Sequence, residues 1–338
     1  MTRSLTTGPD AQWAAARDGT KVVLLDLQRG GAPAVGQLEL PSEDCDLALV
    51  GPPNVLAVVT REPPRVTIFE PPYLEPVAHL DLEVPARLAA LAGPRLVLVS
   101  ADGTHVTIVR TQGRAVSVQK IDPGTPVEFA VGLERNQVLL ALLKKLEVWD
   151  AVSGRPLLRP QLALPPPPRT VGAAQGHLWA TRANSDEVFV YRLSDGRPFR
   201  HYAGAPIEAV VSHPASPVIV LVTARGLVRL HCFAHSLLLV DPAELEAHRW
   251  TPETPLALLV AGADISLIGM PTDGGALWRV GLGGNAAPVL VPEPEREPAQ
   301  APLVSAADKL RAMRAAAVEP AAASEPRAAT ETRSPGAR

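Results

Sequence analysis

The stretch LEVWDAVSGRPLL, from Leu146 to Leu158, reads as two short strands joined by a turn. An apolar and aromatic run ends the first strand. Gly154 stands in the turn, where glycine adopts a positive φ at little cost. If this hairpin recurs at a fixed period along the chain, the fold is a repeat architecture.

Seven segments align with the first strand of this hairpin. They are KVVLLD from Lys21, RVTIFE from Arg65, HVTIVR from His105, KLEVWD from Lys145, EVFVYR from Glu187, LVRLHC from Leu227 and ALWRVG from Ala276. The steps between their first residues are 44, 40, 40, 42, 40 and 49 residues. Spacing this regular indicates one structural unit repeated seven times.

Each repeat contains signals for four strands. An apolar strand such as VLLALL, from Val138, precedes the aligned segment, and a turn rich in Gly, Asp, Asn or Pro separates the two. A second turn leads into another strand, and a proline-marked corner introduces the fourth, as in TPVEFAVGL from Thr125. Val66 and Ile68 show the period-two alternation of a strand. The pattern predicts an all-β fold, a seven-bladed β-propeller of four-stranded antiparallel blades.

Two of the repeats carry a family resemblance. VWDAVSGRPLL (Val148 to Leu158) and VYRLSDGRPFR (Val190 to Arg200) resemble the hairpin of WD-repeat, YVTN-type and quinoprotein-like propellers. Trp149 and Asp150 preserve the WD pair, whereas the Gly-His dipeptide of WD blades is missing from its expected place. The resemblance covers residues ~10 to 293 and implies the blade core of these families rather than a chemistry.

The composition changes near residue 293. We predict a propeller over residues 1–293 and a mostly disordered Pro/Ala/Glu-rich tail over residues 294–338, with a short helix at residues 306–318. Leu310, Met313 and Arg314 of that helix are candidate partner-binding residues, and a frayed linker is the alternative. The ring must also close, either through Arg3–Thr7, which we favour, or through Ala301–Ser305.

Bulk properties exclude several classes of protein. A net charge of −3 without a basic stripe gives no expectation of nucleic-acid binding. No apolar run approaches the ~18 residues that cross a bilayer, and no export signal is visible, so we expect a cytoplasmic protein without a membrane partner. The Arg, Ala, Val, Leu and Pro bias is typical of a GC-rich bacterial genome. Cys45 and Cys232 lie far apart, which predicts buried thiols rather than a disulfide or a zinc site.

Few residues indicate chemistry. His231, Cys232, His235 and Asp241 lie close in sequence, but H-x-x-x-H aligns two ligands only on a helix, and the first half here is a strand. GLGG at Gly281–Gly284 leads to no helix and reads as a turn. We predict no catalytic, cofactor-binding or metal-binding residue. Asp102, Asp150, Asp195 and Asp273 are expected to bond their own turns.

Aromatic and proline residues allow two interpretations each. Trp149, Phe189, Tyr191 and Trp278 occupy equivalent positions, where packing between blades is expected and a partner-binding rim is the alternative. LPPPPRT, from Leu164 to Thr170, is either a stiff connection between blades or a polyproline II ligand.

The function predicted is a non-catalytic protein-interaction scaffold, a monomeric ring in a cytoplasmic bacterial multiprotein assembly. Stand-alone degenerate propellers of this profile resemble the component that accompanies MoxR-type AAA ATPases and von Willebrand A domain proteins in ternary systems. Two further alternatives are a propeller enzyme, either a lyase or a dehydrogenase, and a small-ligand sensor that uses the central channel.

Overall fold

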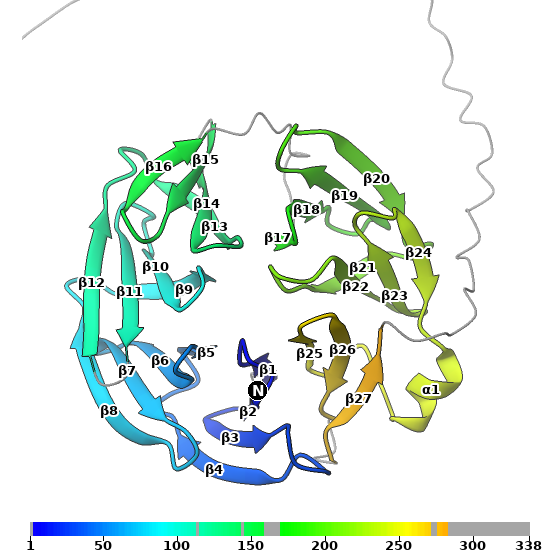
Figure 1. The fold of residues 1–338 in the computed structure, drawn as a ribbon, viewed down its shortest axis with the longest axis horizontal. Helices are drawn as coiled ribbons and strands as arrows, with labels where there is room; N and C mark the ends of the chain where they lie inside the picture. Colours follow the sequence, from blue (N-terminus) through cyan, green and yellow to red (C-terminus); the bar gives the residue numbers. More distant parts are fainter. Residues whose placement is uncertain (1–2, 113–114, 143–144, 159–169, 272–275, 283–338) are drawn as a thin grey trace, which may run out of the picture. The chain divides into compact units, whose positions relative to one another are not determined.

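The structure is a computed structural model that describes residues 3–112, 115–142, 145–158, 170–271 and 276–282. These residues belong to one compact unit, Met1–Glu293. Seven antiparallel sheets are arranged as blades around a central axis (Figure 1). Six blades have four strands each, and the seventh has three strands within the described residues. The predicted seven-bladed β-propeller is therefore confirmed.

The strands take four positions from the axis outward. The innermost strands are β1 (Arg3–Thr7), β5 (Cys45–Val50), β9 (Ala86–Leu91), β13 (Val127–Gly132), β17 (Thr170–Ala174), β21 (Ile207–Val211) and β25 (Leu256–Ala261). The second strands are β2 (Trp13–Asp18), β6 (Val55–Arg61), β10 (Arg95–Ser100), β14 (Gln137–Leu142), β18 (His177–Thr181), β22 (Val218–Thr223) and β26 (Asp264–Gly269).

The third strands overlap the seven segments from which the repeat was predicted, to within two residues at each end. They are β3 (Lys21–Asp26), β7 (Pro64–Glu70), β11 (Val106–Gln112), β15 (Lys145–Asp150), β19 (Glu187–Arg192), β23 (Gly226–His231) and β27 (Trp278–Gly281). The outer strands are β4 (Ala34–Glu39), β8 (Glu75–Asp81), β12 (Ala115–Ile121), β16 (Arg155–Leu158), β20 (Pro198–Tyr202) and β24 (Ser236–Leu239).

One short helix, α1 (Pro242–Ala247), connects the sixth blade to the seventh, and the repeat pattern does not predict it. The side chain of Asp241 accepts a hydrogen bond from the amide of Ala243 and caps the helix, and Pro242 occupies its first turn. In the described part of the chain, no helix has the length and apolarity needed to span a membrane.

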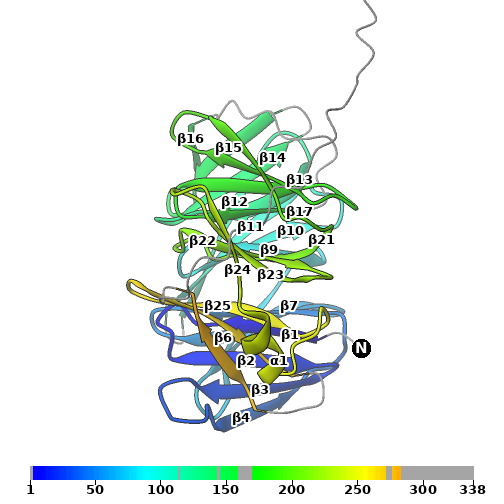
Figure 2. The same ribbon diagram turned by 90° about the vertical axis from the view of Figure 1, so that its right-hand side faces the viewer.

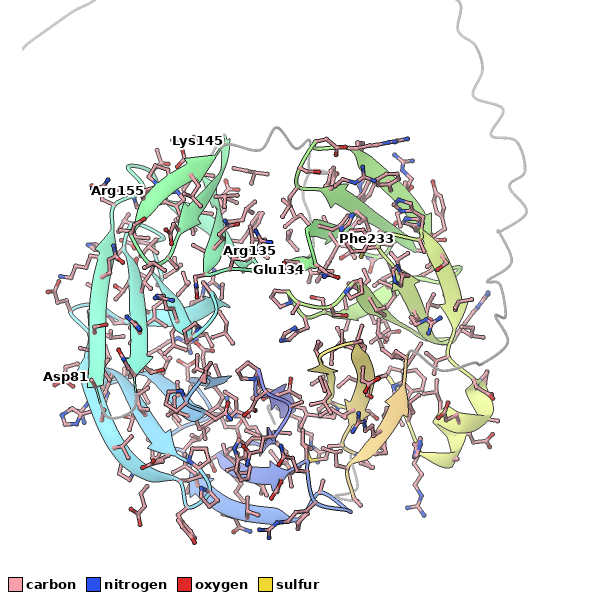
Figure 3. All side chains as sticks on the ribbon, viewed as in Figure 1. Asp81, Glu134, Arg135, Lys145, Arg155 and Phe233 are labelled. Carbon is pink, nitrogen blue, oxygen red and sulfur yellow. The ribbon has the colours of Figure 1, made fainter. Side chains whose placement is uncertain are left out.

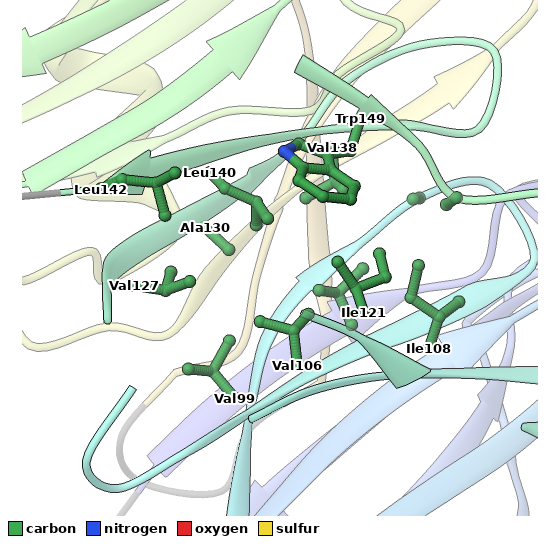
Figure 4. Close-up of a cluster of buried hydrophobic side chains, with 13 residues drawn as sticks. Val99, Val106, Ile108, Ile121, Val127, Ala130, Val138, Leu140, Leu142 and Trp149 are labelled. Carbon is green, nitrogen blue, oxygen red and sulfur yellow. The ribbon is translucent and has the colours of Figure 1, made fainter. Parts of the chain in front are cut away.

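The core lies between the blades. Strands β10 and β22 are buried along their whole length, because a neighbouring blade covers each of their two faces. Figure 4 shows one such cluster, in which Val106 and Ile108 of the third blade face Leu140 and Trp149 of the fourth. Similar clusters join other neighbouring blades, so that burial of apolar side chains holds each blade to the next.

The N-terminal strand closes the ring. Strand β1 pairs with β2 as the innermost strand of the first blade, with Leu5 opposite Ala16. The hydroxyl of Thr7 donates a 2.9 Å hydrogen bond to the carbonyl of Leu258 in the seventh blade. Ala14, Leu259 and Ile268 belong to one apolar cluster across this seam. The favoured N-terminal option is what the structure shows, and Ala301–Ser305 lies outside the described residues.

Glycines allow the backbone to approach closely inside the ring. A Cβ atom on Gly132 would lie 1.7 Å from the carbonyl oxygen of Leu91, on the inner strand of the neighbouring blade. In the fifth blade, Gly172 lies opposite Trp179, and the indole ring covers the glycine. Gly269 and Trp278 repeat this arrangement in the seventh blade. At each of these positions a Cβ atom would collide with the backbone or the indole ring that packs on the glycine, so glycine is required.

Candidate functional site: the first-turn face and the channel mouth

The turns of each blade alternate between two faces of the ring, because consecutive strands are antiparallel (Figure 2). The first turn follows the innermost strand, and the third turn lies on the same side. Hydrogen bonds link neighbouring blades on this side: Arg95, which begins β10, donates to Asn136 at 2.9 Å, and the amide of Gln175 donates to the carbonyl of Ser216 at 3.0 Å. We call the side that carries the first and third turns the first-turn face, and the other side the second-turn face.

The inner strands surround a channel with a cavity of about 650 Å³. Its wall is largely aliphatic, with residues such as Leu49, Ala90, Val131, Val210 and Leu258. The cavity opens on the first-turn face, because residues from the first turns of five blades line it. A cavity of this volume lies within the ~300–1,000 Å³ range of small-molecule sites.

Three ionisable side chains line the cavity: Glu134, Arg135 and His213. Figure 3 shows Glu134 and Arg135 at the inner end of the fourth blade, at the edge of the channel. The Oε1 atom of Glu134 is buried and has no hydrogen-bond partner within the described residues. The Nδ1 atom of His213 accepts a hydrogen bond from the amide of Ala215, and burial lowers the pKa of this histidine.

These groups could orient the polar end of an apolar ligand. Glu134 can accept a hydrogen bond, while neutral His213 keeps its proton on Nε2 and can donate one. Among the lining residues Glu134 is the single carboxylate, so the described wall offers no pair of carboxylates for general acid and base roles.

Large exposed apolar side chains occupy the third turns of three alternate blades, one in each. Tyr73 of the second blade is 78% exposed, and Val152 and Phe233 of the fourth and sixth blades are each 53% exposed. All three belong to the first-turn face. Val118 on β12 and Leu157 on β16 are the other large exposed apolar residues in the described parts of the chain, and they lie on outer strands.

The two faces differ in charge. In the described turns of the first-turn face, acids and bases balance: Asp10, Glu134 and Asp195 against Arg29, Arg135 and Arg197. Acids predominate in the described turns of the second-turn face, where Arg182, Arg225 and Arg249 are the bases. The acids there are Glu43, Asp44, Glu62, Glu83, Asp102, Asp122, Asp186, Asp241, Glu244, Glu246 and Glu253. The first-turn face is therefore the less charged and more apolar of the two.

The predicted roles of the aromatic and turn residues can now be compared with the structure. Trp149, Phe189, Tyr191 and Trp278 are buried in clusters that join neighbouring blades, so packing between blades is confirmed. Asp102, Asp150 and Asp195 each accept a hydrogen bond from the amide two residues later in their own turn, as expected. Asp273 lies outside the described residues.

His231, Cys232, His235 and Asp241, which lie close in sequence, have separate surroundings in the structure. Cys232 is fully buried among apolar residues, and burial raises the pKa of its thiol to about 12. Asp241 caps α1, while His231 and His235 contact aromatic rings of the fifth and sixth blades. Within the described residues, no group of three or more His, Cys, Asp or Glu side chains could hold a metal ion. Cys45 is buried as well, and both cysteines are free thiols.

Several predictions concern other parts of the chain. Leu310, Met313 and Arg314, the helix at residues 306–318 and the disordered tail lie outside the described residues, as does LPPPPRT apart from Thr170 in β17. Conversely, Glu134, Arg135 and Phe233 were not predicted as site residues from the sequence. Their positions directly after an inner or a third strand were the available signal, because such positions form turns on one face.

Comparisons with known proteins agree with the class that this fold defines, a β-propeller. The β-propeller domain of Cps50 (Swd1) from Myceliophthora thermophila matches with a TM-score of 0.57 at 11% identity, over 82% of this chain and 95% of that one. A streptogramin B lyase matches with a TM-score of 0.56 at 11% identity, over 82% and 92%. A chain of the mitotic checkpoint complex gives a TM-score of 0.55 at 12% identity, over 82% and 86%. No protein-family model and no curated protein matches the sequence.

Proposed function

We propose that this propeller is a non-catalytic protein-interaction scaffold of a cytoplasmic bacterial assembly, and that partners bind its first-turn face. The observation that carries the proposal is the placement of Tyr73, Val152 and Phe233. These exposed side chains lie on third turns of three blades of one face, whereas the opposite face is acidic. Exposed aromatic residues and a low density of charge are both typical of the cores of protein interfaces.

The similar solved structures include both a member of a protein assembly and an enzyme. One similar chain comes from a protein complex, and another is a lyase. The proposal of a scaffold rests on the chemistry of this chain, in which a largely aliphatic channel wall contrasts with aromatic residues on the turns outside it.

The test is affinity capture from the native host with the full chain as bait, followed by cross-linking and mass spectrometry. Phe233→Ser and Val152→Ser should lose a stoichiometric partner. Val118→Ser is the matched control, because Val118 is 43% exposed on outer strand β12 and away from the turns. Retention of the partner by both turn variants, or its loss in Val118→Ser, would contradict the proposal. Leu310→Ser and Met313→Ser in the same assay test the predicted contact through the tail.

A small-ligand sensor is the second candidate, and the buried, unpartnered Oε1 of Glu134 at the 650 Å³ cavity supports it. Native mass spectrometry of the full chain from its host tests this candidate. A bound small molecule that disappears in Glu134→Gln would favour the sensor, and identical ligand-free spectra of both proteins would count against it.

A further inference from the structure

Four of the chain's eight histidines meet two phenylalanines at the junction of the fifth and sixth blades. We call this group the histidine–aromatic cluster; its members are His177, Phe199, His201, His231, Phe233 and His235. Phe199 and His201 belong to β20, whereas Phe233 and His235 lie in the third turn of the sixth blade. Figure 3 places Phe233 between the two blades. The cluster is therefore part of the first-turn face.

The rings of the cluster form two groups of contacts, one around Phe233 and one around His235. The ring of His177 meets Phe233 edge to face with centroids 4.7 Å apart, and His231 lies 6.3 Å from Phe233. His235 packs on Phe199 at 3.8 Å and stacks on His201 at 5.5 Å. Phe233 is buried on the side of His177 and half-exposed to solvent, so the cluster presents an aromatic surface.

Hydrogen bonds determine which ring nitrogen carries the proton in two of the imidazoles, His177 and His231. Nδ1 of His177 donates to the carbonyl of Gln175 at 2.9 Å, which leaves Nε2 without a proton in the neutral ring. This Nε2 is buried and unpartnered within the described residues, and His177 is only 1% exposed. Nδ1 of His231 accepts from the amide of Ala234 at 3.2 Å, so its Nε2 carries the proton. Buried ring nitrogens of His201 and His235 also lack partners there.

The charged neighbours of the cluster are almost all basic. The guanidinium groups of Arg192 and Arg197 lie 5.7 and 5.1 Å from the centroid of Phe199. The pKa of His231 is lowered by burial and then by the positive charge of Arg229. The carboxylate of Asp195 is engaged by Arg192 at 3.2 Å and by the amide of Arg197. The cluster thus has cationic groups beside Phe199 and imidazole rings beside both phenylalanines, while the carboxylate of Asp195 is already bonded.

We propose that the histidine–aromatic cluster binds an acidic segment of a partner protein, whose carboxylates approach the imidazoles, Arg192 and Arg197 while an apolar side chain covers Phe233. The inference rests on the proposed scaffold function and names the chemistry of the partner. Charge complementarity favours this occupant, because negative charge would offset the mutual repulsion of the basic groups. Carboxylates also form the strongest hydrogen bonds with guanidinium and imidazolium donors.

The sign of the pH dependence follows from the free protein. Burial and then His235 lower the pKa of His201 to about 4, and burial followed by His177, Arg192, Arg197 and His231 lowers that of His235. Burial also lowers the pKa of His231. These rings are therefore neutral at pH 7. A carboxylate beside them favours the protonated form, so binding takes up protons and tightens as pH falls, by up to about tenfold per pH unit for each proton.

Calorimetric titration of the full chain tests the proposal with two acetylated and amidated probe peptides, EDFED and its neutral counterpart QNFQN, at pH 7.5, 6.5 and 5.5. EDFED should bind at least about threefold tighter with each step down in pH, and QNFQN should not bind. His231→Gln with His235→Asn should remove most of this pH dependence. Asparagine suits position 235, where φ is 51°. Arg29→Gln is the matched control, since Arg29 also lies in a third turn of this face.

Other results would overturn the proposal. Equal binding of the two peptides, binding that does not change with pH, or an equal loss in Arg29→Gln would each do so. Sedimentation velocity without peptide must show a single species, because self-association abolished by the double variant would assign the cluster to a second copy of the chain. If Phe233→Ser loses the cellular partner and EDFED fails to bind, this inference is wrong while the scaffold function stands. If EDFED binds as predicted but no partner is captured, the cluster binds acidic segments while the scaffold function is wrong.

Discussion

Replacing Gly132 by alanine should measure how tightly the inner strands are packed. The added Cβ atom would lie 1.7 Å from the carbonyl oxygen of Leu91 and 2.8 Å from its carbonyl carbon. Ordinary contacts of this kind begin at 3.4 Å, so β9 and β13 would have to separate by about 1.7 Å. Both obstructing atoms belong to the backbone, which means that no side-chain rotation can relieve the contact.

The expected cost follows from that geometry. Overpacking a well-packed interior costs ~1–3 kcal/mol, and the upper end, about 3 kcal/mol, applies where backbone must move. In domains of ~150–250 residues, 1 kcal/mol corresponds to roughly 2–4 °C in Tm. Gly132→Ala should therefore melt about 6–12 °C below the parent protein.

Circular dichroism melts of the full chain provide the assay, and Gly30→Ala is the control. Gly30 lies in the third turn of the first blade, and a Cβ atom there would meet nothing within 4 Å. Its Tm should stay within about 2 °C of the parent, as for most surface substitutions. If Gly132→Ala melts as high as Gly30→Ala, the close approach of β9 and β13 is wrong.

Three further predictions concern single side chains. Thr7→Val removes the 2.9 Å hydrogen bond to Leu258 across the closing seam and should cost about 1 kcal/mol in urea denaturation; no change would show that this bond adds nothing to closure. In a Cys45→Ser background, Cys232 should resist iodoacetamide at pH 8 until the protein is unfolded, because a pKa of about 12 keeps the thiol protonated. Asp102 should titrate at about pH 2 by carbon NMR, and Ser100→Ala should raise that value, because the Ser100 hydroxyl is the largest cause of the lowered pKa, followed by Thr104. Since the folded pKa is lowered, the contribution of Asp102 to stability is present above the unfolded value near 3.8 and is lost as pH falls toward 2.

The fold could be predicted because a propeller repeats one local pattern. Apolar runs such as VLLALL become second strands covered on both faces, and the aligned segments become third strands in every blade. Helix α1 escaped prediction, since it is a single short element outside the repeat, with few residues to show a helical period.

The candidate site could not be predicted, because its residues become neighbours only when the ring forms. Sequence spacing drew attention to His231 and His235 as a pair, while His177 and His201 showed no ligand spacing. The structure brings all four together, because His177 begins β18 of the fifth blade and the third turn of the sixth blade packs against it. Likewise, the position of Glu134 after an inner strand indicates a turn on one face, but the sequence does not show that its carboxylate lines the channel.

Stability and binding use different parts of this chain. The clusters between blades contain Leu140, Trp149 and their neighbours, whereas Phe233 and Val152 project from turns and are 53% exposed. Substitutions on the third turns can therefore change what the ring binds while the blade interfaces stay intact. Loss of a partner in Phe233→Ser without a fall in Tm would locate binding on the first-turn face, whereas parallel losses in both would mean that the side chain acts through the fold. A repeat fold that is held together between its blades leaves its turns free to vary, and Phe233 and His235 of the histidine–aromatic cluster lie in such a turn.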